Sequence, residues 1–272
     1  MKYWLRVYAA QLKIATVIMF QYRFAVLIWA VWGFVGPLLG LAIWSAATEA
    51  KGGSITSARG VTFSQADFAA YFLVFMIVSH LTMSWDAFEF AFRVRDGNLS
   101  PRLLKPILPI HGDIATNFAF KIVTSTMLLP VWALLFYLLK PNINFSIVNI
   151  LVAIPAIFLA VLIRYLFQYC LAMFAFWTTR VEAINQLYFT VDGFLAGRIA
   201  PLALFPGWLG LLAYYSPFRS MATFPVEIIL GRLPAEQFLT GFLYQIFWLG
   251  VGVGLFKLLW AGGMKQYSAV GA

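Results

Sequence analysis

The sequence predicts an all-α membrane protein with six transmembrane helices. Of its 272 residues, 62% are hydrophobic and only 11% are charged, so there is too little polar surface to cover a water-soluble protein of this size. The apolar residues also come in runs of about 20, the length that crosses a bilayer as a helix. We expect the spans near residues 23–43, 68–88, 117–139, 147–174, 184–205 and 238–260.

The net charge of +9 fits a membrane protein better than a nucleic-acid-binding one. The basic residues lie at the ends of apolar runs, and no long basic block is interleaved with aromatic residues, so we expect no nucleic-acid partner. Six spans put both termini on one side, and the positive-inside rule makes that side cytoplasmic. Ten basic residues then lie inside, namely Lys2, Arg6, Lys13, Arg23, Arg93, Arg95, Arg102, Lys105, Arg180 and Lys265, and six outside, namely Lys51, Arg59, Lys140, Arg198, Arg219 and Arg232.

Residues 1–21 are expected to form an amphipathic helix at the membrane surface, ahead of a single membrane domain over 22–272. The spacing of Lys2, Arg6 and Lys13 places them on one helical face. A cleaved signal peptide is the alternative, but no uninterrupted apolar core is followed by a small-residue cleavage site. The opposite face carries apolar side chains, namely Trp4, Val7, Ile14 and Ile18.

The first outer loop, residues 46–67, contains the run Lys51-Gly-Gly-Ser. Glycine and serine favour turns and flexible connections, so we expect a solvated connector there.

The cytoplasmic connection over residues 91–115 predicts a short helix that begins at Ser100-Pro101 and ends at Lys105-Pro106. Arg102 and Lys105 form its basic side, and Leu103 and Leu104 belong to its apolar side. Such a helix is suited to docking in the groove of a soluble partner. It is equally suited to lying on lipid headgroups, and the residues alone leave both interpretations open.

The outer region, residues 201–235, is interrupted by five prolines, which predicts short helical pieces that cannot cross a bilayer. Ser216-Pro217 is a helix start signal, and Trp208 is expected to anchor the pieces at the membrane interface. Arg219 and Glu227 lie eight residues apart with a proline between them. They therefore need not share a helical face, and we expect both to lie mainly in contact with solvent or headgroups.

Two charges, Arg164 and Asp192, lie deepest in the apolar runs, each roughly 12 to 15 Å from the cytoplasmic ends of its span. A single charge near the bilayer centre costs about 2.5 to 3.5 kcal/mol, so a pair at matched depth is expected. The pair either locks two helices together or lets Asp192 face a transport pathway. Lys121 lies near an inner end and is expected to extend its amine to the interface.

Asp86 and Glu89, three residues apart at the inner end of the second span, are expected to be structural and neutralised by Arg93. The alternative is an intramembrane enzyme that acts on lipid through Asp86, Glu89 or His80, but no nucleophile, base and orienting group occur together. No GxxxxGK[ST], HExxH or CxxC motif is present, so we expect no catalytic residue, no metal site and no bound ATP.

Several short motifs resemble one family. They are Gly-Arg-Ile-Ala-Pro-Leu at 197–202, Phe-Pro-Gly-Trp-Leu at 205–209, Ser-Pro-Phe at 216–218, Pro-Val-Glu-Ile-Ile-Leu-Gly at 225–231, and the pair Gln245 and Trp248. The chain resembles the permease subunits of type-2 ATP-binding-cassette exporters, in particular a bacterial, multidrug-like subgroup. The likeness in hydropathy and element order extends from about residue 21 to the end.

The resemblance implies a multi-pass subunit of a bacterial inner membrane that works as a dimer with a second copy or a related permease. Separate ATPase subunits would bind ATP and Mg²⁺, so this chain would need no cofactor. The implied coupling helix carries Ser100, Arg102, Leu103, Leu104 and Lys105, and Trp208, Pro217 and Arg219 would anchor an outer gate. The implied cargo is amphipathic or cationic compounds, or lipids.

Overall fold

Helices form most of the chain that the structure describes, which confirms the all-α prediction. A computed structural model describes residues 2–58, 60–178 and 181–267; Arg59 and Arg180, counted above, lie outside them. The α-helices are α1 (Lys2–Gln21), α2 (Arg23–Ala50), α3 (Gln65–Thr82), α4 (Asp86–Arg95), α5 (Ser100–Leu103), α6 (Pro109–Leu139), α7 (Ile147–Met173), α8 (Val181–Leu195), α9 (Gly207–Tyr215), α10 (Phe224–Ile229) and α11 (Glu236–Gln266). Three shorter helical segments are η1 (Phe174–Phe176), η2 (Leu202–Leu204) and η3 (Arg219–Thr223).

Among the described residues, five helical stretches are long and apolar enough to cross a membrane. They are Arg23–Ala50, Gln65–Arg95, Pro109–Leu139, Ile147–Phe176 and Glu236–Gln266. The sixth expected span, over 184–205, does not reach this length, because α8 has only 15 residues. The chain is therefore a multi-pass membrane protein, and its sixth crossing stays a prediction.

Helix α8 ends at Leu195, and other helices bind the two carbonyl groups that follow it. Gly197 adopts a left-handed conformation with φ of 77°, which glycine tolerates and which commonly ends a helix. The Tyr71 hydroxyl donates to the Gly197 carbonyl at 2.7 Å, and the Thr223 hydroxyl donates to the Ala196 carbonyl at 2.6 Å. The continuous run expected over 184–205 is therefore broken by contacts from α3 and η3.

The second expected span is also interrupted, between Thr82 and Asp86. Met83 has extended backbone torsions, with φ of −59° and ψ of 151°. The Ser84 hydroxyl donates to Asp86 Oδ2 at 2.6 Å, and such local side-chain bonds compete with helix formation. This break starts a new helix, α4, inside the protein.

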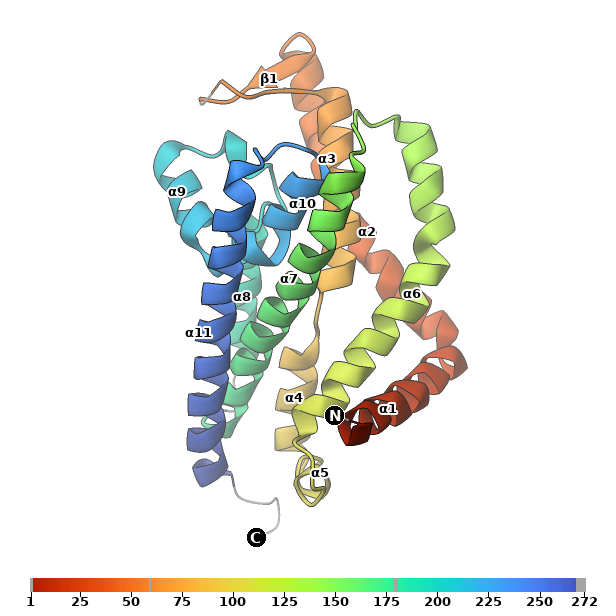
Figure 1. Cartoon of the computed structure of the whole chain (residues 1–272), viewed down its shortest axis with the longest axis vertical. Coiled ribbons are helices and arrows are strands. Elements are labelled where there is room, and N and C mark those ends of the chain that lie inside the picture. Colours follow the sequence, from red (N-terminus) through yellow and green to blue (C-terminus); the bar gives the residue numbers. More distant parts are fainter. Residues whose placement is uncertain (1, 59, 179–180, 268–272) are drawn as a thin grey trace.

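The elements gather at two ends of an elongated helical body (Figure 1). Helix α5 and the last turns of α11 lie at the lower end, and the hairpin of β1 (Ser54–Thr56) and β2 (Thr62–Ser64) lies at the upper end. Helix α7 packs against α11, α4 and α10, and α1 packs along α6. The Tyr8 hydroxyl lies 2.6 Å from His111 Nδ1, which fixes α1 to the start of α6. Burial raises the pKa of Tyr8.

The first outer loop is more ordered than the expected solvated connector. Strands β1 and β2 pair antiparallel, with Ile55 opposite Phe63. Ser64 and Asp67 form a reciprocal capping box that begins α3. Arg232 binds Asp67 at 2.9 Å and lies 4.3 Å from the Phe63 ring centre. These contacts join the hairpin to the chain ahead of α11.

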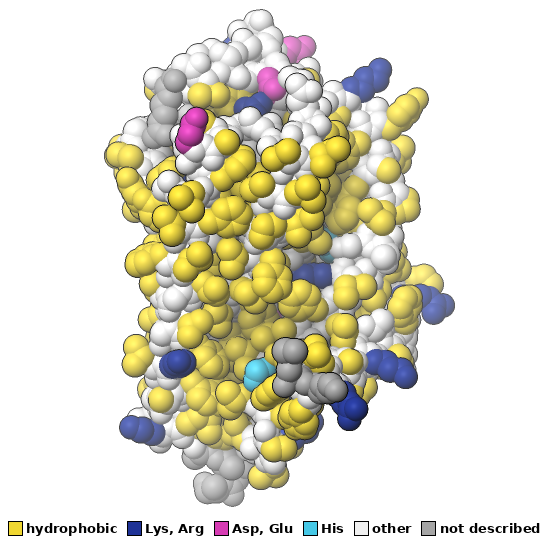
Figure 2. Space-filling model, viewed as in Figure 1, with side chains coloured by type: hydrophobic (Ala, Val, Ile, Leu, Met, Phe, Trp, Pro, Cys, Tyr) yellow, Lys and Arg dark blue, Asp and Glu magenta, His cyan; other side chains and the backbone are white. Residues whose placement is uncertain are grey.

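The surface supports a membrane location. In Figure 2, hydrophobic side chains cover most of the middle of the visible face, and several lysine and arginine side chains lie in its lower half. Exposed aromatic residues such as Trp29 and Trp32, at 70% and 72% exposure, belong to α2, where lipid or another chain would cover them. An apolar exterior of this extent requires such a cover.

Candidate functional site

The end of the molecule that carries α5 is organised around Asp113, in the second turn of α6. This carboxylate is 2% exposed and accepts from Arg93 at 2.7 Å and from Arg102 at 2.8 Å. The Tyr169 hydroxyl donates to it at 3.4 Å. Arg93 also pairs with Glu89, as expected. One buried acid thus ties together α4, α5, α6 and α7.

The segment predicted to couple to an ATPase contains a short helix, and its residues divide into inward and outward groups. Helix α5 is a single turn that begins, as predicted, at Ser100 with Pro101. Ser100 Oγ lies 2.7 Å from the Tyr267 hydroxyl. Leu103 is half-buried against the inner core, the hydrophobic cluster that contains Phe90 and Tyr169. Leu104 is 88% exposed and Lys105 is exposed. Leu103 and Leu104 therefore do not share one apolar face.

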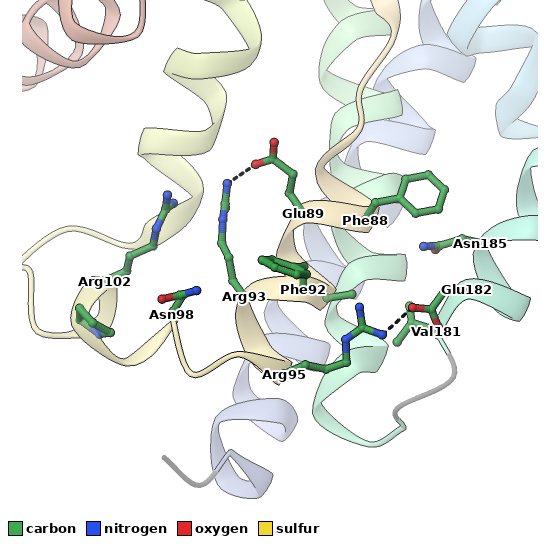
Figure 3. Close-up of a pocket in the computed structure, with 12 residues that line it drawn as sticks. Phe88, Glu89, Phe92, Arg93, Arg95, Asn98, Arg102, Val181, Glu182 and Asn185 are labelled. Atoms are coloured by element: carbon green, nitrogen blue, oxygen red, sulfur yellow. Dashed lines mark hydrogen bonds and ion pairs between the residues drawn. The ribbon is translucent and has the colours of Figure 1, made fainter. Parts of the chain in front are cut away.

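An open pocket of about 900 Å³ lies beside this segment, between α4, the α5 loop and α8 (Figure 3). Phe88 and Phe92 contribute aromatic side chains to its wall. Arg95 binds Glu182 at 2.7 Å across it. A backbone hydrogen bond and then the charge of Arg95 lower the pKa of Glu182. The pocket thus combines apolar and charged walls, which is typical of ligand and partner sites.

The structure brings Arg164 and Asp192 together, deep in the helical body. Arg164 Nη2 lies 3.2 Å from Asp192 Oδ1, and both side chains are almost fully buried. Arg198 Nη2, which belongs to the segment after α8, lies 3.0 Å from Asp192 Oδ2. The aspartate therefore faces two arginines, one at each carboxylate oxygen.

Further polar groups are buried between α4, α6 and α7. Asp86 accepts from Ser84 and from the Asn117 amide at 3.4 Å. Within the described residues, the ion pairs of Arg93 run to Glu89 and Asp113 and not to Asp86, which differs from the expectation. Lys121 is 5% exposed, and no hydrogen-bond partner for its Nζ lies within the described residues. Its amine does not reach the interface, because α6 turns it toward the protein interior.

His80, Asp86 and Glu89 are not assembled into one site. His80 Nε2 bonds to the Thr124 hydroxyl at 2.8 Å, whereas the bonds of the two acids run to other partners. A catalytic centre needs a nucleophile, a base and an orienting group within mutual reach. The described contacts of these three residues do not provide that arrangement.

The outer region corrects the expectation for Arg219. Its side chain is 5% exposed, binds Glu227 at 2.7 Å, and lies 4.3 Å from the ring centre of Tyr214. The helix that begins at Pro217 is not broken by Pro225, because residues 219–223 adopt π-helical i→i+5 bonding. Eight α-helical residues would leave the two charges about 80° apart around the axis, and the wider π turn reduces that angle.

Arg219→Ala is expected to lower the stability of the purified protein more than Trp208→Ala. Removing the guanidinium leaves Glu227 without its ion-pair partner and Tyr214 without its cation. Together these losses should lower the free energy of unfolding by about 1 to 3 kcal/mol. Trp208 is 71% exposed, so its loss costs little packing. Thermal unfolding in detergent compares the two variants, and an equal or larger loss for Trp208→Ala would contradict the buried role of Arg219.

The comparisons with known proteins agree with this architecture. A family model described as "ABC-2 family transporter protein" matches residues 34–271, which is most of the chain. The chain belongs to the ABC-2 transporter family. Comparison with curated proteins and with solved structures gives no match.

Membership in the ABC-2 family makes the chain a membrane permease component of a transporter and not itself a catalyst. Such permeases normally work with ATPase partners. The alternative of an intramembrane enzyme acting on lipid is therefore not supported.

Two residues of the ABC-2 chain lie at buried charge clusters that the sequence alone does not reveal. Asp113 was not singled out, although an acid one turn into an apolar run, with two arginines shortly before it, is a detectable signal. Arg198 lies near the outer end of the span expected over 184–205, so the charge count places it outside. The early end of α8 folds it back to within 3.0 Å of Asp192.

Proposed function

We propose that this chain is the membrane-spanning subunit of an ATP-driven exporter in a bacterial inner membrane, with both termini in the cytoplasm. Two copies, or this chain and a related permease, would enclose the pathway. Separate ATPase subunits would bind ATP and Mg²⁺ and drive the transport cycle. The family match over residues 34–271 supports the transport role.

One observation supports coupling through the α5 segment most directly. Asp113 holds Arg93 and Arg102, so the loop that carries α5 is fastened to α4 and α6 at buried positions. The same loop leaves Leu104 88% exposed at the end of the molecule. A rigid base with an exposed apolar tip is what a helix docked in a partner's groove requires.

The geometry also bears on the cargo. Asp192 is held by Arg164 and Arg198, which favours the structural role of this pair over that of a counter-charge for a cation. We therefore favour amphipathic compounds or lipids over strongly cationic ones. The short outer helices, with Trp208, Pro217 and Arg219, would close the pathway on the outer side.

Leu104→Asp is expected to abolish association with the ATPase subunit while leaving insertion and folding intact. The side chain packs against almost nothing in this chain, so its loss costs no core packing, whereas a buried carboxylate in the partner's groove would be costly. Co-expression of the chain with its neighbouring genes, followed by purification from detergent and a search for a co-purifying ATPase subunit, measures the association.

Val61→Asp is the matched control, because Val61 is an exposed apolar residue (40%) in the outer hairpin region. It should retain the ATPase subunit. Normal co-purification of Leu104→Asp would refute the assignment of α5 as the coupling element. Leu103 is unsuitable for this test, since it also packs against the inner core.

A further inference from the structure

The pocket beside α5 has the size and the apolar wall of a small-ligand site. Its volume of about 900 Å³ falls within the range of roughly 300 to 1,000 Å³ that is common for such sites. Phe88 and Phe92 line it from α4, and Val181 lines it from α8. The Phe88 ring stacks on Phe189 with centres 5.6 Å apart. The stacking fixes the Phe88 ring in the pocket wall, where an apolar group of a ligand can pack against it.

A buried polar group at the pocket has no partner. Asn185 is 1% exposed, and neither its Nδ2 nor its Oδ1 has a hydrogen-bond partner in the described parts of the chain. In Figure 3, Asn185 extends from α8 toward the α4 side of the pocket, near Phe88. An unpaired buried amide costs about 1 to 3 kcal/mol. A polar group of a ligand that entered the pocket would satisfy it.

The charged wall favours an acidic headgroup. Three arginines line the pocket, Arg93, Arg95 and Arg102, against two acids, Glu89 and Glu182. Arg93 is occupied by two carboxylates. Arg95 and Arg102 each bind one carboxylate through a single terminal nitrogen. A guanidinium has five N–H donors, so these two arginines retain donors for an incoming anion.

We propose that this pocket binds an amphiphile with an acidic headgroup, with the headgroup at Arg95, a polar linker at Asn185 and the apolar chain against Phe88 and Phe92. The assignment rests on the proposed export function, for which it supplies the substrate class and a cytoplasmic loading site. Its central feature is the buried Asn185 amide at the junction of the charged and apolar walls.

Cysteine protection tests the proposal on the full chain in phosphatidylcholine nanodiscs. Cys170 is the single cysteine and is buried, so Cys170→Ala with Asn98→Cys leaves one thiol at the pocket wall. Dodecyl phosphate is expected to slow maleimide labelling of this thiol. Cys170→Ala with Leu104→Cys is the control, because Leu104 does not line the pocket, and its labelling should not change.

Two further probes separate the sources of binding. Equal protection by inorganic phosphate would reduce the pocket to a simple anion site and overturn the amphiphile assignment. Equal protection by dodecyltrimethylammonium would overturn the acidic headgroup. No protection by dodecyl phosphate would refute the site altogether.

Variants of the same labelled chain locate the contacts. Arg95→Gln and Asn185→Ala are each expected to weaken dodecyl phosphate binding about tenfold, the loss of one hydrogen bond involving a charged or buried group. Arg6→Gln, an exposed arginine outside the pocket, should have no effect. The proposal is contradicted if Arg95→Gln and Asn185→Ala both bind dodecyl phosphate as tightly as the parent chain. If one of the two folds poorly, the other still provides the test. ATPase co-purification, measured separately, shows whether a negative result concerns this pocket or the export function itself.

Discussion

Asp113→Asn is expected to uncouple the inner segment and to destabilise the protein by about 3 kcal/mol, the lower end of the range for breaking a buried ion pair. The neutral amide would leave Arg102 without its carboxylate and Arg93 with only Glu89. The loop that carries α5 would then lose its fixed position. Thermal unfolding and co-purification with the ATPase subunit should therefore decline together.

Glu89→Gln is the matched control, because it removes the other acid that binds Arg93. The Glu89 side chain is 47% exposed, and exposed pairs contribute only about 0 to 1 kcal/mol. If Glu89→Gln keeps near-normal thermal stability and co-purification while Asp113→Asn loses both, the effect belongs to the buried Asp113 carboxylate. Equal behaviour of the two variants would mean that Asp113 does not organise this end of the protein.

The largest loss of folded protein is expected for Asp192→Asn. Arg164 is 3% exposed and lies opposite this aspartate, so neutralising the acid leaves a buried, uncompensated cation. Breaking such a pair costs about 3 to 5 kcal/mol, a large fraction of the roughly 5 to 15 kcal/mol by which a typical domain is stable. The yield of monodisperse protein after size-exclusion chromatography measures this loss.

Two companion variants separate the structural role from a pathway role. Arg164→Met with Asp192→Leu should recover much of the yield, because apolar residues of similar size often replace a buried pair without loss. Arg198→Gln should be mild, since its side chain is 38% exposed and the inner pair remains. If Asp192→Asn folds normally but fails to transport, the aspartate belongs to the substrate pathway instead.

The helices themselves could be predicted from the sequence, because length and hydropathy determine which runs can cross a bilayer. The interruptions could not. The end of α8 depends on hydroxyl groups of Tyr71 and Thr223, which belong to α3 and η3, and no local pattern reports such distant partners. Pro225 was expected to break its helix, yet π-helical bonding accommodates it.

The candidate sites show the same division between local and distant information. The hydropathy pattern was enough to propose that Arg164 and Asp192 lie near each other, because consecutive spans place them at similar depth. The second arginine at Asp192 depends on the turn at Gly197. The ion pairs of Asp113 with Arg93 and Arg102 form only because α4, α5 and α6 meet at one end of the molecule. The segment around α5 also depends on distant residues, because Leu99 and Leu103 pack in the hydrophobic cluster that contains Phe90 and Tyr169.

The most direct test of the central claim is the ATP hydrolysis rate of the ATPase subunit that co-purifies with this chain, measured in proteoliposomes with and without the permease. If the chain is an ATP-coupled permease, the wild-type protein should change that rate, and Leu104→Asp should leave it at the value of the ATPase alone. An ATPase rate that is identical with wild-type permease, with Leu104→Asp and with no permease would contradict the coupled-transport account.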